Sequence, residues 1–121
     1  MKTALVVDDN ATNRLLAATI LRKLGWTVSE ADSGEQAIAL FPALAPRLVL
    51  LDISMPGLSG EETCARLRAV VLACRPHVVA YTAHAFQEDI DRLLAAGFDD
   101  TLIKPINRQR LEQIAAGLNV G

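Results

Sequence analysis

Runs of aliphatic residues alternate along this chain with segments in which apolar residues recur at the three- to four-residue spacing of a helix. The aliphatic runs predict five β-strands, at Thr3–Asp8, Thr27–Ala31, Arg47–Asp52, His77–Thr82 and Thr101–Lys104. The other segments predict five helices, at about Ala11–Leu24, from Ser33 to just before Pro46, and at Ser59–Cys74, Phe86–Ala96 and Arg108–Leu118. Because strand and helix alternate strictly, the pattern indicates a parallel sheet with helices on both faces.

The strands differ in how continuous their apolar character is. The first, third and fourth are nearly unbroken aliphatic runs, typical of strands buried on both faces of a parallel sheet. The second, Thr27–Ala31, is more polar and alternating, which favours a place at the edge. We therefore expect one domain over residues 1–121, with a flavodoxin-like, doubly wound (βα)5 α/β fold and a five-stranded parallel sheet in the order 2-1-3-4-5. That order makes the first and third strands neighbours at the topological switch point, where such sheets bind ligands.

The ends of the helices carry their own signals. Gly25 and Gly97 follow the first and fourth predicted helices and mark their C-terminal ends. Ser33 and Ser59 are N-cap candidates for the second and third helices. The apolar residues that recur at helical spacing in the first helix are Leu16, Ile20, Leu21 and Leu24, and they predict its buried face.

Composition and charge exclude several function classes. The formal net charge is −2 and the pI about 5.6, so the chain lacks the broad basic field of a nucleic-acid-binding protein. The longest apolar runs are far too short to span a membrane, and no signal-peptide pattern precedes the first strand. We expect a cytoplasmic domain without membrane contact. Cys64 and Cys74 lie about 15 Å apart along one predicted helix, too far for a disulfide, and are expected to be reduced thiols.

Polar side chains stand where the aliphatic runs end. Asp8 and Asp9 follow the first run, Asp52 ends the third, Thr82 ends the fourth and Lys104 ends the fifth. Two carboxylates about 4 Å apart repel by roughly 4 kcal/mol at an effective dielectric constant of 20, so a shared site here needs a cation. Ligands that are all oxygen suit Mg²⁺, or alternatively Mn²⁺. A divalent ion, an ammonium, a hydroxyl and a carboxylate nucleophile together suit phosphoryl transfer.

These strand ends resemble the signature of the response-regulator receiver domain of two-component and phosphorelay signalling. The segments that carry the resemblance are Asp8-Asp9-Asn10, Asp52-x-x-Met-Pro-Gly, Thr82-Ala83 and Lys104-Pro105, the last expected to hold a cis peptide bond. The resemblance implies that Asp52 accepts a phosphoryl group from a partner phosphohistidine with Mg²⁺, and passes it on or signals through the phosphorylated form. The residues expected to assist are Thr82 and Lys104, with Ser54 and the Ala83 amide holding phosphoryl oxygens. The implied metal ligands are Asp9, Asp52 and the Ser54 backbone carbonyl, with Asp8 acting largely through water.

A finer resemblance points to the receivers of hybrid sensor histidine kinases. The segments are Asp9-Asn10-x-x-Asn13-Arg14, Thr82-Ala83-His84-Ala85 and Ala96-Gly97-Phe98-Asp99-Asp100. The implied partner is a histidine kinase or a histidine phosphotransfer protein, and the chain would then be a piece of a longer kinase. The residues expected to dock this partner are Asn13, Arg14, Leu15, Ala18, Pro105 and Ile106.

Two positions qualify the resemblance. Three residues before the lysine, the family usually carries Tyr, Phe or His, a side chain that swings inward when the threonine hydroxyl moves toward phosphate. Here the residue is Thr101, so we expect a small conformational response on the face from the fourth strand to the fifth helix. His84, two residues past Thr82, is a candidate for setting the lifetime of the phosphoryl group, whereas His77 opens a strand and is expected to be structural.

We expect a phosphoacceptor that catalyses nothing beyond its own phosphorylation and dephosphorylation. Three other functions are alternatives to it. A haloacid-dehalogenase-type phosphohydrolase needs a second carboxylate two residues after the nucleophile, where this chain has Ser54. A flavin or nucleotide binder needs a phosphate loop, and the sequence contains neither G-x-G-x-x-G nor a P-loop. A degenerate receiver that acts as a phosphorylation-independent interaction module stays as the alternative, although all five key positions are retained.

Overall fold

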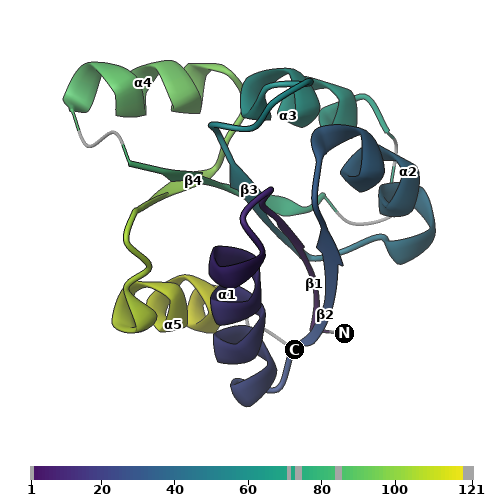
Figure 1. Ribbon diagram of the computed structural model, residues 1–121, viewed down its shortest axis with the longest axis vertical. Helices are drawn as coiled ribbons and strands as arrows, with labels where there is room; N and C mark the ends of the chain where they lie inside the picture. The colour runs from purple at the N-terminus through teal and green to yellow at the C-terminus, as the bar shows by residue number, and fades with distance from the viewer. Residues whose placement is uncertain (1, 71, 73–74, 84–85, 119–121) are drawn as a thin grey trace.

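The computed structural model, which describes residues 2–70, 72, 75–83 and 86–118, shows five strands and five helices in alternation (Figure 1). The strands are β1 (Thr3–Val7), β2 (Thr27–Ala31), β3 (Leu48–Asp52), β4 (His77–Thr82) and β5 (Asp100–Ile103). The helices are α1 (Ala11–Lys23), α2 (Gly34–Leu44), α3 (Gly60–Arg68), α4 (Gln87–Ala95) and α5 (Arg108–Gly117). The alternation predicted from the hydrophobic pattern is therefore confirmed.

All strand pairs in the sheet are parallel, and the order is β2-β1-β3-β4-β5. The predicted flavodoxin-like topology is confirmed, with the more polar β2 at one edge and β5 at the other. β1 and β3 are neighbours, and Val7 is in register with Leu51. Asp8 follows Val7 and Asp52 follows Leu51, so the two carboxylates are brought to the same edge of the sheet.

Helices cover both faces of the sheet (Figure 1). α1 and α5 lie on one face, where Leu21 and Leu111 pack into a core with Leu50 and Tyr81. α2, α3 and α4 lie on the other face. Their residues Phe41, Leu67 and Leu93 pack against the strand side chains that point to that face, among them Val49, Val78 and Ala80. Neighbouring residues on β4 therefore pack into different cores: Ala80 under α2, α3 and α4, and Tyr81 under α1 and α5.

The predicted helix signals are confirmed where the structure describes them. Gly25 and Gly97 adopt φ angles of 92° and 112°, the left-handed region in which glycine has no Cβ penalty. The Ser33 side chain accepts the backbone N–H of Gln36 at the start of α2. Ser59 caps α3, and Glu62 returns the bond to the Ser59 N–H, so the two form a capping box.

Two helix predictions are wrong in detail. α3 ends at Arg68 rather than continuing to Cys74, and the Arg68 side chain turns away to the carbonyls of Gly97 and Pro76. α3 therefore does not extend from Cys64 to Cys74, contrary to the sequence prediction; Cys64 is buried and free, and Cys74 lies outside the described residues. On α1, Leu16 is 46% exposed, whereas the smaller Ala17 packs into the core between the helix and the sheet.

In the part of the chain that the structure describes, no helix has both the length and the apolar character required to cross a membrane.

Candidate functional site

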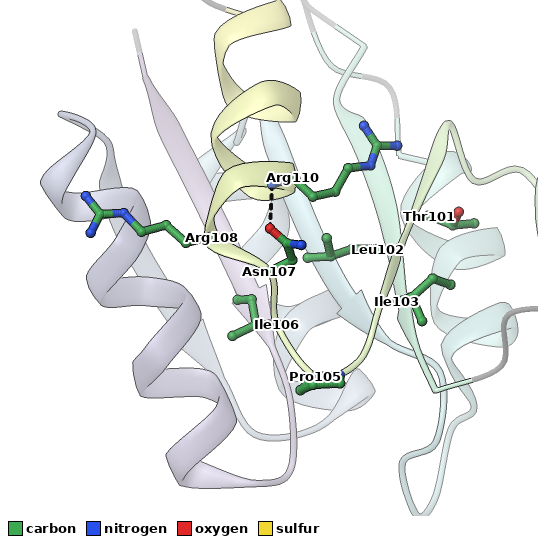
Figure 2. Close-up of a pocket in the computed structure, with 8 residues that line it drawn as sticks. All are labelled: Thr101, Leu102, Ile103, Pro105, Ile106, Asn107, Arg108 and Arg110. Carbon is green, nitrogen blue, oxygen red and sulfur yellow. Dashed lines mark hydrogen bonds between the residues drawn. The ribbon is translucent and has the colours of Figure 1, made fainter.

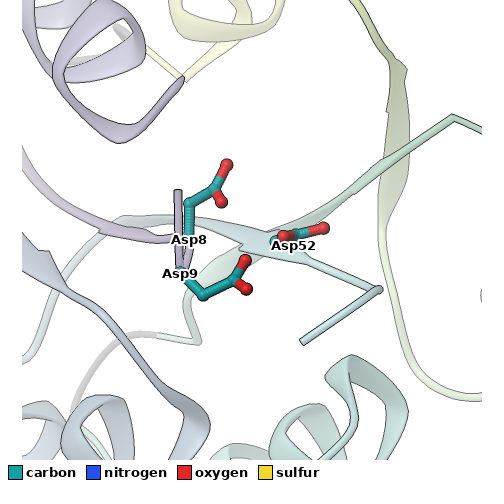
Figure 3. A group of neighbouring side chains, drawn as sticks. All are labelled: Asp8, Asp9 and Asp52. Carbon is teal, nitrogen blue, oxygen red and sulfur yellow. The ribbon is translucent and has the colours of Figure 1, made fainter. Parts of the chain in front are cut away.

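Three carboxylates meet at the ends of β1 and β3. One oxygen each of Asp8, Asp9 and Asp52 lies within 4.8 Å of the others, and Figure 3 shows the three side chains at this common edge. Asp8 and Asp52 are each 1% exposed, whereas Asp9 is exposed to solvent. The convergence predicted from the strand ends is therefore present: two buried carboxylates with one at the rim.

Asp52 is held by a cation and by its own turn. Lys104 Nζ lies 3.0 Å from Asp52 Oδ1, and this lysine side chain is 22% exposed. The backbone N–H of Ser54 donates to the same oxygen at 3.1 Å. Lys104 follows β5, and its backbone N–H donates to the Thr82 carbonyl at 2.7 Å, which places the lysine beside the end of β4. The peptide bond between Lys104 and Pro105 is cis, as the resemblance implies.

Asp8 is the least satisfied member of the cluster. Its Oδ1 accepts the backbone N–H of Asn10 at 2.8 Å, but its buried Oδ2 has no hydrogen-bond partner among the described residues. Burial first, and then the charge of Asp52, raise the pKa of Asp8 from 3.8 to about 6, although the Asn10 N–H and Lys104 act in the opposite direction. The ionised cluster is therefore unfavourable without a further positive charge.

The donor set fits a hard divalent cation. All three side chains offer carboxylate oxygens, and one buried oxygen lacks a partner within the described chain. Mg²⁺ prefers such ligands and keeps part of its water shell, for which the exposed Asp9 leaves room. The residues that would hold the ion are Asp8, Asp9 and Asp52, with the Ser54 carbonyl following in the same turn.

The acidic turn is supported from α1. Arg14 Nη1 donates to the backbone carbonyl of Asp8 at 2.8 Å, and Arg14 Nε donates to Glu30 on β2 at 3.2 Å. Glu30 also pairs with Arg22, which is more exposed. The sequence predicts Arg14 only as a docking residue, and this support of the acidic turn is additional to that prediction. Its position one turn past the Asn10 N-cap, where a long side chain reaches back to the strand end, could have indicated it.

The remaining predicted site residues lie at the ends of β4 and of the loop after β3. Thr82 is 1% exposed and ends β4, Ala83 follows it at the surface, and Ser54 is exposed beside Asp52. His77 is the first residue of β4 and is half-buried. His84 and Ala85 lie outside the described residues.

The predicted docking residues form a mixed set. Leu15 on α1 is 57% exposed, Pro105 is exposed, and Asn13 and Arg14 are half-buried. Ala18 is 0% exposed, so its methyl group offers no surface to a partner in this structure.

A groove opens where β5 leads into α5. Its volume is about 760 Å³, and Pro105 and Ile106 line it together with residues of β5 and α5 (Figure 2). Arg108 and Arg110 contribute cationic side chains to its rim. The half-buried Ile106 also packs against the core on the α1 and α5 face. The turn after Lys104 therefore joins the acidic site to a surface groove.

Comparisons with known proteins agree with this geometry. The sequence profile of the response regulator receiver domain matches residues 4–116. The chain is 42% identical to the virulence sensor protein BvgS of Bordetella bronchiseptica over 93% of its own length and 10% of that protein. It is 35% identical to the signal transduction histidine-protein kinase BarA of Escherichia coli K12, over 93% of this chain and 12% of that protein. The chain thus spans about a tenth of the length of these curated relatives.

Solved structures show the same fold. A putative response regulator from Chloroflexus aurantiacus superposes with a TM-score of 0.89 at 29% identity, covering 97% of this chain and 96% of that one. The receiver domain of NtrX from Brucella abortus superposes with a TM-score of 0.84 at 31% identity, covering 95% and 96%. Since the profile covers most of the sequence and these neighbours cover nearly all of the fold, the chain belongs to the response regulator receiver domain family.

Proposed function

We propose that Asp52 is a phosphoacceptor that takes a phosphoryl group from a phosphohistidine on a partner protein. The observation that supports this most directly is the pairing of a buried Asp52 carboxylate with Lys104 at 3.0 Å, inside a cluster of three carboxylates. A lysine alone would suffice for one structural ion pair. The additional carboxylates, one with an unpartnered buried oxygen, fit a site built for a cation and an incoming anion.

The transfer balances with the groups present. A carboxylate oxygen of Asp52 attacks phosphorus, a new O–P bond forms, the P–N bond breaks, and the imidazole leaves and takes up a proton. Lys104, already within reach of Asp52, neutralises charge on the phosphoryl oxygens. Thr82 and the Ala83 amide stand at the adjoining strand end to hold two of those oxygens. Mg²⁺, held by Asp8, Asp9, Asp52 and the Ser54 carbonyl, would supply the remaining positive charge.

The test is adduct formation with a small donor, which needs no partner. Wild type and Asp52→Asn are incubated with acetyl phosphate or beryllofluoride, with and without Mg²⁺, and the adduct is measured by mass spectrometry for the phosphoryl group and by NMR for beryllofluoride. We expect a Mg²⁺-dependent adduct in wild type alone. An adduct that persists in Asp52→Asn would overturn the assignment. A wild type that stays unmodified would favour a phosphorylation-independent interaction module.

We further propose that the partner is a histidine kinase or histidine phosphotransfer protein, and that it docks on the surface formed by Leu15 and the Pro105–Ile106 turn. An exposed leucine at 57% and an exposed proline beside the site offer apolar area to a partner helix. Leu15→Asp should slow transfer from the partner and leave phosphorylation by acetyl phosphate unchanged. Leu94→Asp is the matched control, since Leu94 is 45% exposed on α4, across the sheet. Equal loss in both assays would refute docking at Leu15.

A further inference from the structure

Lys104 is bound on two sides. Its Nζ lies 3.0 Å from Asp52 Oδ1 and 5.0 Å from the centroid of the Tyr81 ring. An ammonium at this distance from a ring is attracted to the electron-rich face, and the attraction grows as water is excluded. Tyr81 is 2% exposed, so the ring is fixed by packing and cannot leave the lysine without disturbing the core.

Tyr81 also reaches the turn after Lys104. The Ile106 backbone approaches the Tyr81 hydroxyl and acts to lower the pKa of the phenol. Burial, and then the charges of Asp8 and Asp52, raise the pKa of Tyr81 above its usual value, so the phenol stays neutral near pH 7. Ile106 lines the groove at the start of α5, where Figure 2 shows it next to Pro105. One rigid side chain therefore contacts both the lysine of the site and the backbone of the groove.

The other face of the sheet offers no comparable side chain at the matching positions. Tyr81 is in register with Leu102, and both belong to the core under α1 and α5. Ala80 is in register with Thr101, and Ala80 belongs to the core under α2, α3 and α4. Because residues in register on neighbouring strands point to the same face of a sheet, Thr101 stands on the same side as Ala80. Two small residues thus occupy the α4 side, while a tyrosine and a leucine occupy the α5 side.

We propose that Tyr81 is a positioning residue for Lys104, and that it couples the charge at Asp52 to the groove at residues 105–108. The proposal rests on Asp52 being the phosphoacceptor. Phosphorylation replaces one carboxylate charge by about two charges on oxygens farther from the Asp52 backbone. Lys104 then follows those oxygens across the ring face, and the Ile106 backbone at the other end of the tyrosine changes its environment.

The two ends of Tyr81 can be separated by substitution. Tyr81→Phe keeps the ring under Lys104 but removes the hydroxyl, whereas Tyr81→Leu removes both. Leu111→Ala is the control for lost packing, since Leu111 is 0% exposed in the same core and lies on α5 rather than beside the lysine. Backbone amide shifts are recorded with and without beryllofluoride and Mg²⁺, and rates of phosphorylation by acetyl phosphate are measured on the same proteins.

We expect the adduct to shift the Ile106 and Asn107 amides in wild type and in Leu111→Ala. Tyr81→Phe should phosphorylate within about twofold of wild type and lose most of the shift at Ile106. Tyr81→Leu should lose that shift and phosphorylate roughly three- to tenfold more slowly, as expected for a weakened cation–π contact. Restoration of the rate by phenylalanine but not by leucine is a result that packing alone would not produce.

The outcomes distinguish this inference from the proposed function. If wild type forms no adduct, the phosphoacceptor assignment fails, and the coupling fails with it. If every variant forms the adduct and Ile106 shifts equally in Tyr81→Leu, the coupling alone is overturned. It is also overturned if the largest shifts fall on residues 87–101, the α4 side, rather than on residues 104–107.

Discussion

Replacing Asp8 by asparagine should stabilise the protein while weakening the proposed Mg²⁺ site. Asparagine has nearly the same shape as a protonated aspartic acid, and its amide oxygen can still accept the Asn10 N–H that Asp8 Oδ1 accepts at 2.8 Å. What disappears is a buried negative charge beside Asp52. In the absence of a metal ion, that charge on balance opposes folding, because burial and Asp52 outweigh the Asn10 N–H and Lys104. The substitution therefore tests whether the acidic cluster is held together at a cost in stability.

The size of the effect follows from the raised pKa of Asp8. Since its pKa lies at about 6 in the folded protein and near 3.8 in the unfolded chain, the folded state binds more protons between these values. The free energy of unfolding therefore falls as the pH rises from about 4 to 6, and the stabilising contribution is fully present only below the unfolded pKa. A difference of roughly two pKa units means that, at pH 7.5, the ionised Asp8 lowers the free energy of unfolding by about 3 kcal/mol. At pH 4 the ionisation of Asp8 lowers the free energy of unfolding by only about 0.5 kcal/mol.

Urea unfolding gives the measurement, because Trp26 is the only tryptophan of the chain and is 5% exposed. Wild type and Asp8→Asn are unfolded at pH 4 and pH 7.5, with a chelator and then with Mg²⁺. The advantage of the variant should grow from about 0.5 to about 3 kcal/mol between the two pH values without metal. Mg²⁺ should stabilise wild type at pH 7.5 and stabilise the variant less.

A stability difference between the two proteins that does not change with pH would contradict a raised pKa of Asp8. In that case Asp8 would be either ionised without penalty or neutral throughout, and repulsion within the cluster would not be the reason for a cation. Carboxylates remote from the cluster titrate over the same range in both proteins and cancel in the difference. Asp52 is coupled to Asp8 and does not cancel, so the result reports on Asp8 together with its repulsion from Asp52.

Two further substitutions test neighbouring features of the fold. Arg14→Ala should weaken Mg²⁺ binding roughly tenfold in a calorimetric titration, because the Asp8 carbonyl loses its 2.8 Å donor. Arg22→Ala is the control, since Arg22 is the more exposed partner of Glu30, to which Arg14 also binds; it should change the affinity less than about twofold. Equal losses would contradict a role for Arg14 in holding the acidic turn. Gly34→Ala should lower the free energy of unfolding by about 1–3 kcal/mol, because the added Cβ would meet Thr63 Oγ1; an unchanged urea midpoint would contradict this close helix contact.

The sheet and its acidic edge could be predicted because both depend on short, regular rules. Unbroken aliphatic runs identify strands buried on both faces, and strict alternation with helices limits the topology to a few orders. Once the order places β1 beside β3, Asp8 and Asp52 must be neighbours, whatever the loops do. The meeting of Lys104 with Asp52 likewise follows from where β5 ends.

What could not be predicted depends on tertiary contacts. The length of α3 was overestimated, because an apolar pattern continues past Arg68 although the side chain of Arg68 turns away to Gly97 and Pro76. Ala18 entered the docking set through the family resemblance, and its complete burial depends on packing that the sequence does not reveal. The contact between Tyr81 and Lys104 could not be predicted, because a tyrosine in a strand before a threonine is ordinary, and only the fold places Lys104 over its ring.

The direction of the response to phosphorylation can be argued from the sizes of paired residues. A displacement in a close-packed interior is transmitted where side chains are already in contact, and small residues transmit little. On the α4 side, Ala80 and Thr101 are paired, so a movement of Thr82 or Lys104 meets few atoms that lead to α4. On the α5 side, Tyr81 and Leu102 are paired, and Tyr81 reaches the Ile106 backbone. The same turn lies next to the surface proposed to bind the phosphodonor. In this receiver we therefore expect phosphorylation to change how well the donor stays bound, more than the shape of α4.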